Sequence, residues 1–275
     1  MSLPGGIRVA GRLRRDYRFR PVDGAMELAL AESLEGEAGM AARVTRALGA
    51  SLAMIGGERA DERLAASLAV ADRQFLMRRL AAHLGRGGQW LSVVCRNCGE
   101  RFDFHVEHHR LPVKPAGEGF PRVEVRLARG LAVFRAPTGA DQEAIADVLA
   151  IEGPGAAQRA LAQRCLESVD GRAVSGADFT PADLQAIDAA MEAVAPEVAT
   201  ELEAACPHCG GSERIYLDPY QAVGAGGMEL FHEIHVLAWH YHWSEAEILA
   251  MPRARRRRYL GLIDRARGMS VEASA

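Results

Sequence analysis

The sequence predicts an α+β protein organised in three regions. Apolar residues recur at helical spacing through much of residues 23–84, and the helical pattern returns from residue 228 almost to the end. Between these stretches lie two Cys-x-x-Cys-Gly motifs, each flanked by residues typical of β-strands. The regions are an N-terminal strand plus helical region (1–88), a β core with a helical insertion (89–220, insertion about 139–193) and a C-terminal helical hook (221–275).

Length and composition are ordinary for a globular protein. The 275 residues can bury a real core, and a formal charge of -3 argues against general nucleic-acid binding while leaving room for a local basic patch. Lys114 is the single lysine, so arginine carries nearly all of the positive charge. The sequence has neither a signal-peptide pattern nor a run of about 18 apolar residues. We therefore expect a cytoplasmic protein.

The N-terminal region is expected to begin with a short edge strand and to continue as helices. Residues 13–22 alternate polar and apolar side chains over a few positions. From residue 23 to 55 the pattern is helical, and it stops at two glycines. A third helix is expected over 61–84, ended by Gly85. The apolar stripe of these helices is typical of core packing.

The middle region mixes strand and helix patterns. Strands are expected at 90–94, 102–106 and 214–217, beside the two cysteine motifs, and as a hairpin at 122–134, and residues 198–205 lead into the second motif. Helices are expected at 139–150, with Thr138 as N-cap, and at 155–168 and 180–193. The Gly-rich residues 224–227 predict a hinge or a cap, because they lack the Gly-Lys-Ser/Thr ending of a phosphate-binding loop.

Four of the five cysteines form two matched pairs, Cys95/Cys98 and Cys206/Cys209. Each pair places two thiolates on one tight turn, and two such turns supply the four ligands of a closed tetrahedral zinc site. Because no ligand position stays open for water, we expect a structural zinc ion in a zinc-ribbon-like β core. The alternative is four free cysteines or a vestigial site. A thioredoxin-like redox pair is disfavoured, because neither motif opens a helix after a βαβ strand.

The fifth cysteine and the nearby histidines are weaker candidates for ligands. Cys165 lies on an expected helix and is interpreted as a small buried hydrophobe. His208 lies inside the second motif, and His105, His108 and His109 follow the first. With four cysteines available, we expect these histidines at the surface or beside the site.

The C-terminal region contains the stretch HYHWSEAEIL, which combines ring-bearing residues with a helix start. Ser244 and Glu247 fit a capping box that opens a short helix. We expect the aromatic rings to pack as an elbow between helices. A metal role for His240 and His242 is disfavoured, because the four cysteines close a zinc site without them.

Five arginines follow on a helix that is expected to begin near Pro252. They cannot share one face, because helical residues advance by about 100° each, so some of their stems must cover neighbouring apolar surface. Such a helix fits either a helix-turn-helix reader of DNA or a hook that binds an acidic partner protein. We expect the second, with a partner-binding set of Trp243, Arg253, Arg255, Arg256, Arg257, Arg258 and Tyr259.

Four stretches carry a resemblance to a known family: ADRQFLMRRLAAHLG, FRAPTGADQEAIA, ALAQRC and EIHVLAWHYHWSEAEILAMPRARRRRYLGLI. In this order, over roughly residues 13–265, the chain resembles the T-even-type baseplate hub assembly proteins of contractile phage tails and extracellular contractile injection systems. The resemblance implies a non-enzymatic assembly factor, or chaperone, or a baseplate component. Its partners would be hub, spike or wedge proteins in the bacterial cytoplasm. Phage members of the family need not carry both cysteine pairs, so zinc rests on the residues alone.

Two other functions compete with this one. A zinc-ribbon nucleic-acid-binding protein would use the C-terminal arginines, but the residues around the cysteine motifs are mixed or acidic rather than basic. A hydrolase is disfavoured further, because the sequence has no Gly-x-Ser-x-Gly motif, no paired catalytic carboxylate signature and no phosphate loop. We therefore expect no catalytic residues.

Overall fold

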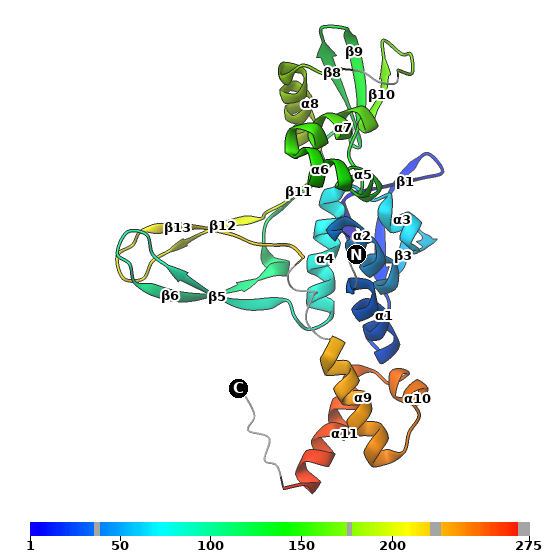
Figure 1. The fold of residues 1–275 in the computed structure, drawn as a ribbon, viewed down its shortest axis with the longest axis vertical. Coiled ribbons are helices and arrows are strands. Elements are labelled where there is room, and N and C mark those ends of the chain that lie inside the picture. The colour runs from blue at the N-terminus through cyan, green and yellow to red at the C-terminus, as the bar shows by residue number, and fades with distance from the viewer. Residues whose placement is uncertain (36–38, 175–177, 221–226, 269–275) are drawn as a thin grey trace.

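The computed structural model describes residues 1–35, 39–174, 178–220 and 227–268. It confirms the predicted α+β class, with helices and small antiparallel sheets in four parts (Figure 1). An N-terminal domain lies at the centre with an insertion subdomain above it, two hairpins project to one side, and a helical hook lies below. Within the described ranges, no helix combines the length and apolarity that crossing a membrane requires.

The N-terminal domain is built on a four-stranded sheet whose strands follow the order of the chain. The strands are β1 (Ser2–Val9), β2 (Arg12–Phe19), β3 (Leu52–Ile55) and β4 (Glu58–Arg59). The helices are α1 (Gly24–Leu34), α2 (Met40–Ser51), α3 (Glu62–Ala66) and α4 (Val70–His83). Apolar side chains of sheet and helices form one buried core, which includes Tyr17, Leu48, Leu52, Ile55, Leu76 and Leu80.

The strands of this domain differ from the prediction in two ways. β2 is an inner strand rather than an edge strand, because β1, which no sequence pattern indicated, pairs with it. The end of the expected second helix is strand β3. Gly56 and Gly57 adopt φ values of +61° and +85° there, which turns the chain back into β4 as a tight hairpin.

The helix expected over 61–84 is two helices, α3 and α4. Between them the backbone of Ala69 forms a bridge with Thr138, and the N–H of Val70 donates to the carbonyl of Pro137 at 3.2 Å. These partners lie far away in sequence. The helical spacing of apolar residues continues from α3 into α4, so the sequence gave no sign of the break between them.

A buried carboxylate joins β1 to α4. Asp72 is fully buried and accepts hydrogen bonds from the backbone N–H groups of Gly5 (2.8 Å) and Gly6 (2.9 Å). A Cβ atom at Gly5 would lie 2.6 Å from Asp72 Oδ2, so glycine is what allows the strand to come this close. Desolvation raises the pKa of Asp72 to about 6, against the lowering effect of the two N–H donors and of Arg15.

We expect Asp72 to make the folded chain less stable as the pH rises. The folded pKa of about 6 exceeds the ordinary value of 3.8, so the folded state holds the proton more tightly. This contribution to stability is therefore complete below about pH 4 and is lost as the pH passes about 6. Two pKa units correspond to about 3 kcal/mol. Urea unfolding between about pH 4 and pH 7 should show the wild type losing up to this amount relative to Asp72→Asn. Parallel pH curves for the two proteins would contradict the assignment.

The insertion subdomain has a sheet and a core of its own. Its sheet has the order β10-β9-β8. The strands are β8 (Arg122–Leu127), β9 (Gly130–Arg135) and β10 (Leu166–Val169). The helices are α5 (Gly139–Ala144), α6 (Ala146–Glu152), α7 (Pro154–Cys165) and α8 (Pro181–Val194). The predicted hairpin at 122–134 is confirmed, but it pairs with β10 rather than with the strands beside the cysteines. The insertion is therefore a mixed subdomain and not only helical.

Asp141 holds the insertion subdomain together at the start of α5. It is almost fully buried, and its carboxylate accepts two hydrogen bonds from Arg135 (2.5 and 2.8 Å) and one from Arg164 (3.1 Å). It also completes the capping box with Thr138, which confirms the predicted N-cap. Burial would raise the pKa of Asp141, but the hydrogen bonds from Arg135 and Thr138 outweigh it and lower the pKa to about 2.

Arg73 of α4 connects the N-terminal domain to the insertion subdomain. Its guanidinium is fully buried and donates to Thr45 Oγ1 (2.8 Å) and to the carbonyls of Ala65 (3.0 Å) and Ala41 (2.6 Å). The Thr45 hydroxyl in turn donates to the carboxylate of Glu143 on α5. The buried Arg73 guanidinium therefore connects α2, α3 and α4 of the N-terminal domain to α5 of the insertion subdomain.

We expect Gly139→Ala to destabilise the chain by about 1–3 kcal/mol, the usual cost of overpacking a buried site. A Cβ atom at Gly139 would lie 2.0 Å from Arg73 Nη1, so the guanidinium would have to leave its hydrogen-bond partners. Gly155→Ala is the matched control, because that position is also in the first turn of a helix and its Cβ would meet nothing closer than 3.9 Å. Chemical denaturation of both variants tests this. Equal effects would show that the close approach to Arg73 is unimportant.

The two projecting hairpins, which we call the ribbon, hold the cysteine motifs in their loops. They are β5 (Gly88–Val94) with β6 (Arg101–Glu107), and β12 (Glu201–Ala205) with β13 (Ser212–Tyr216). The strands predicted beside the motifs are thereby confirmed. A short 3₁₀ helix (His108–Arg110) and the pair β7 (Val113–Lys114) and β11 (Glu197–Val198) lie where the chain leaves and re-enters the ribbon.

The C-terminal hook consists of α9 (Gly227–Tyr241), α10 (Glu245–Leu249) and α11 (Arg253–Ala266). Leu237, Ile248 and Ile263 form its small core. Ser244 and Glu247 make both hydrogen bonds of the predicted capping box. The hinge or cap predicted at 224–227 lies outside the described residues, except that α9 begins at residue 227.

Candidate metal centre

Four cysteine sulfurs meet at the outer end of the ribbon. The Sγ atoms of Cys95, Cys98, Cys206 and Cys209 all lie within 4.8 Å of one another. Cys95 Sγ is 3.7 Å from Cys209 Sγ, and Cys98 Sγ is 3.8 Å from Cys206 Sγ. The whole insertion subdomain separates the two loops along the chain. The fold thus brings together all four cysteines that the sequence predicted as ligands, close enough to bind one metal ion.

The two loops share one backbone construction. The N–H of Gly99 donates to the carbonyl of Cys95 at 2.8 Å, and the N–H of Gly210 donates to the carbonyl of Cys206 at 2.9 Å. The two glycines have φ values of +77° and +73°, a conformation that side chains with a Cβ disfavour. The glycine after each pair therefore turns the chain back and leaves both sulfurs of that loop on one side.

The electrostatics of the cluster favour a cation. The Asn97 side-chain amide, together with the N–H of Gly211, lowers the pKa of the Cys209 thiol to about 6. The N–H of Glu100 lowers the pKa of Cys98, but desolvation and the three neighbouring thiols outweigh it and raise that pKa to about 12. Four thiolates this close would repel one another, so all four thiols can lose their protons together only where a positive charge, such as a metal ion, lies between them.

Contacts between the hairpins surround the sulfurs. Glu213 of β13 is buried and accepts a hydrogen bond from the backbone N–H of Arg96 at 2.6 Å, with the Arg96 guanidinium 3.7 Å away. In the same direction, Asn97 Nδ2 of the first loop donates to Cys209 Sγ of the second at 3.4 Å. Sequence reasoning missed these residues. The signal available was the presence of hydrogen-bonding side chains between the cysteines of the first motif.

The four histidines near the motifs are not part of the sulfur cluster, and three of them are exposed, as expected, whereas His108 is not. His208 is exposed in the second loop, His105 packs beside a tryptophan ring, and His109 lies 3.8 Å from a carboxylate. His108 is buried, and burial lowers its pKa. Within the described residues, the cluster able to hold a metal ion contains cysteines only. Cys165 is completely buried in the core of the insertion subdomain, as predicted.

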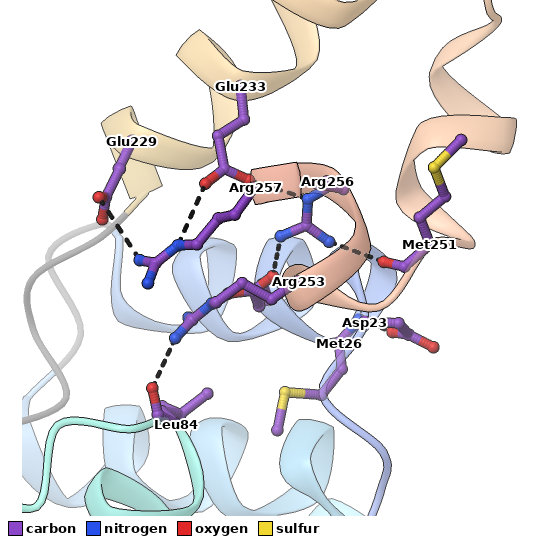
Figure 2. A network of polar contacts seen from close by, with 10 residues as sticks. Asp23, Met26, Leu84, Glu229, Glu233, Met251, Arg253, Arg256 and Arg257 are labelled. Atoms are coloured by element: carbon purple, nitrogen blue, oxygen red, sulfur yellow. Dashed lines mark hydrogen bonds and ion pairs between the residues drawn. The ribbon is translucent and has the colours of Figure 1, made fainter. Parts of the chain in front are cut away.

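The arginine-rich helix α11 is attached to the N-terminal domain through an internal ion-pair network (Figure 2). Arg253 and Arg256 both bind the carboxylate of Glu27 on α1. Arg256 Nε also donates to Glu233 of α9 at 2.9 Å, and Arg253 Nη1 donates to the carbonyl of Leu84 at 2.5 Å. The network therefore joins α9 and α11 of the hook to α1 and Leu84 of the N-terminal domain.

This network corrects part of the predicted partner-binding set. The Arg256 side chain is only 1% exposed and that of Arg253 17%, so these two arginines bind within the chain and not to a partner. Arg255, Arg257 and Arg258 remain exposed. The acids that hold the network were not predicted. Glu233 lies between Leu230 and Leu237 at helical spacing, and an acid within an apolar stripe was the available sign of a buried ion pair.

The predicted aromatic elbow is confirmed by ring contacts. The rings of Tyr241 and Trp243 stack at 4.5 Å, and Tyr259 of α11 lies 4.8 Å from Trp243 and 5.4 Å from Tyr241. Trp243 and Tyr259 are half-buried by these contacts. His240 Nδ1 bonds the carbonyl of its own helix at Val236 (2.9 Å). The elbow fixes the angle between α9 and α11 and has no metal-binding arrangement among its described residues.

Comparisons with protein-family models, with curated proteins and with solved structures find no match for this chain.

Proposed function

We propose that the four cysteines bind one zinc ion in a structural role. Tetrahedral zinc–thiolate bonds of about 2.3 Å place neighbouring sulfurs about 3.8 Å apart. Two of the sulfur pairs, at 3.7 and 3.8 Å, fit this spacing. Sulfur is a ligand that zinc prefers, and four sulfurs leave no position for a water molecule or a substrate. Such a closed site supports folding rather than catalysis.

The ribbon needs this support because its apolar core is small. Cys95, Phe102 and Cys206 form that core, with Val93, Phe104 and Ala204 packed against it. A two-stranded hairpin is marginally stable by itself in water, and here two hairpins meet over few apolar side chains. A zinc ion shared by both loops would fix their relative position and keep the ribbon as one rigid projection.

We further propose that the protein is a non-enzymatic assembly factor, or a component, of the baseplate of a contractile phage tail or contractile injection system. The observation that carries this proposal is the order of four family-like stretches along one chain, ending in the segment that forms the aromatic elbow. Its partners would be hub, spike or wedge proteins, which it would bind in the bacterial cytoplasm. The exposed arginines of α11 offer bidentate hydrogen bonds to an acidic patch on such a partner.

Co-expression with the hub, spike and wedge proteins of the same particle tests this function. We expect the tagged chain to co-purify with at least one of them, and Arg255→Ala/Arg258→Ala to lose this capture while remaining folded. Arg12→Ala/Arg14→Ala, which removes two other exposed arginines, is the matched control and should keep it. Failure of the wild type to bind any of these proteins would contradict the proposal.

Titrating the purified chain with duplex DNA distinguishes this function from the alternative of a nucleic-acid-binding protein. We expect no tight binding at physiological salt. Tight binding with a steep salt dependence, lost in Arg255→Ala/Arg258→Ala, would instead support a zinc-ribbon nucleic-acid-binding protein.

A further inference from the structure

A groove lies between the two hairpins of the ribbon. Residues 102–107 of β6 and 202–205 of β12 line it, together with Arg110, Leu111 and Pro207, and it has a volume of about 610 Å³. Side chains of a strand alternate between the two faces of the sheet, so a run of consecutive residues lines a groove only where the edge of the strand faces it. The groove is therefore bounded by the edge of β6 and the edge of β12.

The edge of β6 that faces the groove has free backbone hydrogen-bonding groups. The N–H of His108 donates to the carbonyl of Gly87 at 2.8 Å, which identifies these two residues as a hydrogen-bonded pair. Such pairs alternate along an antiparallel ladder, so the N–H and C=O groups of Asp103, His105 and Glu107 point away from β5. Among the strands that the structure describes, none pairs with this edge of β6.

The edge of β12 is free in the same way. The N–H of Leu217 donates to the carbonyl of Thr200 at 2.7 Å, so the same alternation directs the backbone groups of Glu201, Glu203 and Ala205 away from β13. β6 and β12 belong to separate two-stranded sheets. A row of unpaired N–H and C=O groups is a template for a further strand. Here two such rows line one groove, so a strand that enters it has hydrogen-bond partners on both sides.

The side chains that line the groove are apolar or mainly acidic. The apolar ones are Phe102, Phe104, Val106, Leu202 and Ala204. The carboxylate of Glu107 forms an ion pair with Arg110 at 2.5 Å, so these two charges cancel. Asp103 and Glu203 are exposed, and neither forms an ion pair within the part of the chain that the structure describes. The groove therefore carries two uncompensated negative charges beside an apolar surface.

We propose that this groove binds an extended segment of a partner protein, which pairs with the free edge of β6 and carries alternating basic and apolar side chains. In strand addition of this kind, backbone hydrogen bonds supply affinity and the alternate side chains supply specificity. The apolar side chains of the segment would pack on Phe104 and its neighbours, and the basic ones would face Asp103 and Glu203. This inference goes beyond the proposed assembly role, because it concerns a class of peptide and not a baseplate protein.

Amide hydrogen exchange of the full-length chain, resolved by NMR, tests the pairing with the blocked peptide Lys-Val-Lys-Val-Lys-Val-Lys as the probe. We expect the N–H groups of Asp103, His105 and Glu107 to exchange fast in the free chain and at least about tenfold more slowly at saturation with peptide. Ser92 of β5 and Arg214 of β13 are internal controls, because their N–H groups point to the two edges outside the groove. Their exchange should not change.

Two modified peptides separate backbone pairing from charge attraction. The same peptide with every peptide nitrogen methylated keeps its charges and side chains but cannot donate backbone hydrogen bonds, so it should not protect these amides. The peptide Glu-Val-Glu-Val-Glu-Val-Glu should bind at least about tenfold more weakly than the lysine peptide. Equal protection by the methylated peptide would overturn the proposal.

A charge-reversal variant tests the acidic residues of the groove. Asp103→Lys/Glu203→Lys should bind the lysine peptide at least about tenfold more weakly and should bind the glutamate peptide instead, which also shows that the variant is folded. Glu118→Lys/Glu124→Lys is the matched control, because it reverses two exposed carboxylates outside the ribbon. It should bind both peptides as the wild type does.

Three results would contradict the proposal. The first is a lysine peptide that does not bind at up to about 1 mM. The second is a peptide that binds without slowing exchange at Asp103, His105 and Glu107. The third is protection of these amides in the peptide-free chain, which would mean that the chain itself or a second copy already covers the edge. Capture of baseplate proteins is measured separately, so either idea can fail alone.

Discussion

Replacing Arg256 with alanine is expected to destabilise the folded chain by about 3–5 kcal/mol, the usual cost of leaving a buried charge without its partner. Arg256 is 1% exposed and binds both Glu27 and Glu233, which are themselves only 9% exposed. Its Nη1 also donates to the carbonyl of Met251 at 2.8 Å (Figure 2). Without this guanidinium, Glu27 would keep Arg253 as its partner, but Glu233 would be left with the Arg257 guanidinium at 4.0 Å, and the two carboxylates would repel each other. Chemical denaturation measures the loss of stability.

Arg255→Ala is the control for this prediction. Arg255 is the neighbouring residue on the same helix, it is exposed, and its guanidinium lies 5.9 Å from the ring of Tyr259. Its removal should change stability by no more than about 0.5–1 kcal/mol. If Arg256→Ala cost as little as Arg255→Ala, the network would not be what attaches the hook, and α11 would be free to bind through all of its arginines.

Replacing Cys206 with serine is expected to abolish stoichiometric metal binding and to unfold the ribbon. Apparent binding free energies for structural zinc in small domains reach about 10–16 kcal/mol, far more than the few apolar contacts of the ribbon can supply. Hydrogen exchange should therefore lose protection in β5, β6, β12 and β13. The helices of the insertion subdomain should remain protected, because they have a separate core around Phe134, Cys165 and Ile187.

Cys165→Ala is the matched control for the metal site. This cysteine is completely buried far from the sulfur cluster in sequence and in structure, so its removal should cost stability without loss of metal. Loss of protection throughout the chain in Cys206→Ser would show that ribbon and insertion fold as one unit. Full protection of the ribbon in that variant would show that the metal is not needed for its fold.

Local chemistry explains which features the sequence could predict. The Cys-x-x-Cys-Gly loops, the hairpin at 122–134 and the capping boxes each depend on residues a few positions apart. They appear in the structure as expected. The same holds for the aromatic elbow, in which Tyr241 and Trp243 lie two positions apart on the chain. In each case the residues that make the local structure lie within a few positions of one another in the sequence.

Features that depend on distant partners could not be predicted in this way. Strand β1 contains two adjacent glycines and a proline, and it is held by pairing with β2 and by Asp72 of α4. The break between α3 and α4 depends on a bridge to Thr138. The arginines of α11 looked alike in sequence. The position of Glu27 on α1, far away along the chain, is what distinguishes Arg253 and Arg256, which bind it, from the three arginines that stay exposed.

The zinc content of the purified chain tests the central claim most directly. Protein prepared without added metal should contain close to one zinc ion per chain by elemental analysis and native mass spectrometry, with all four thiols unreactive until a chelator removes the metal. Cys165→Ala should retain the ion, and Cys206→Ser should lose it. A wild-type chain that contains no metal, reacts at all four thiols and still keeps a protected ribbon would contradict a structural zinc site.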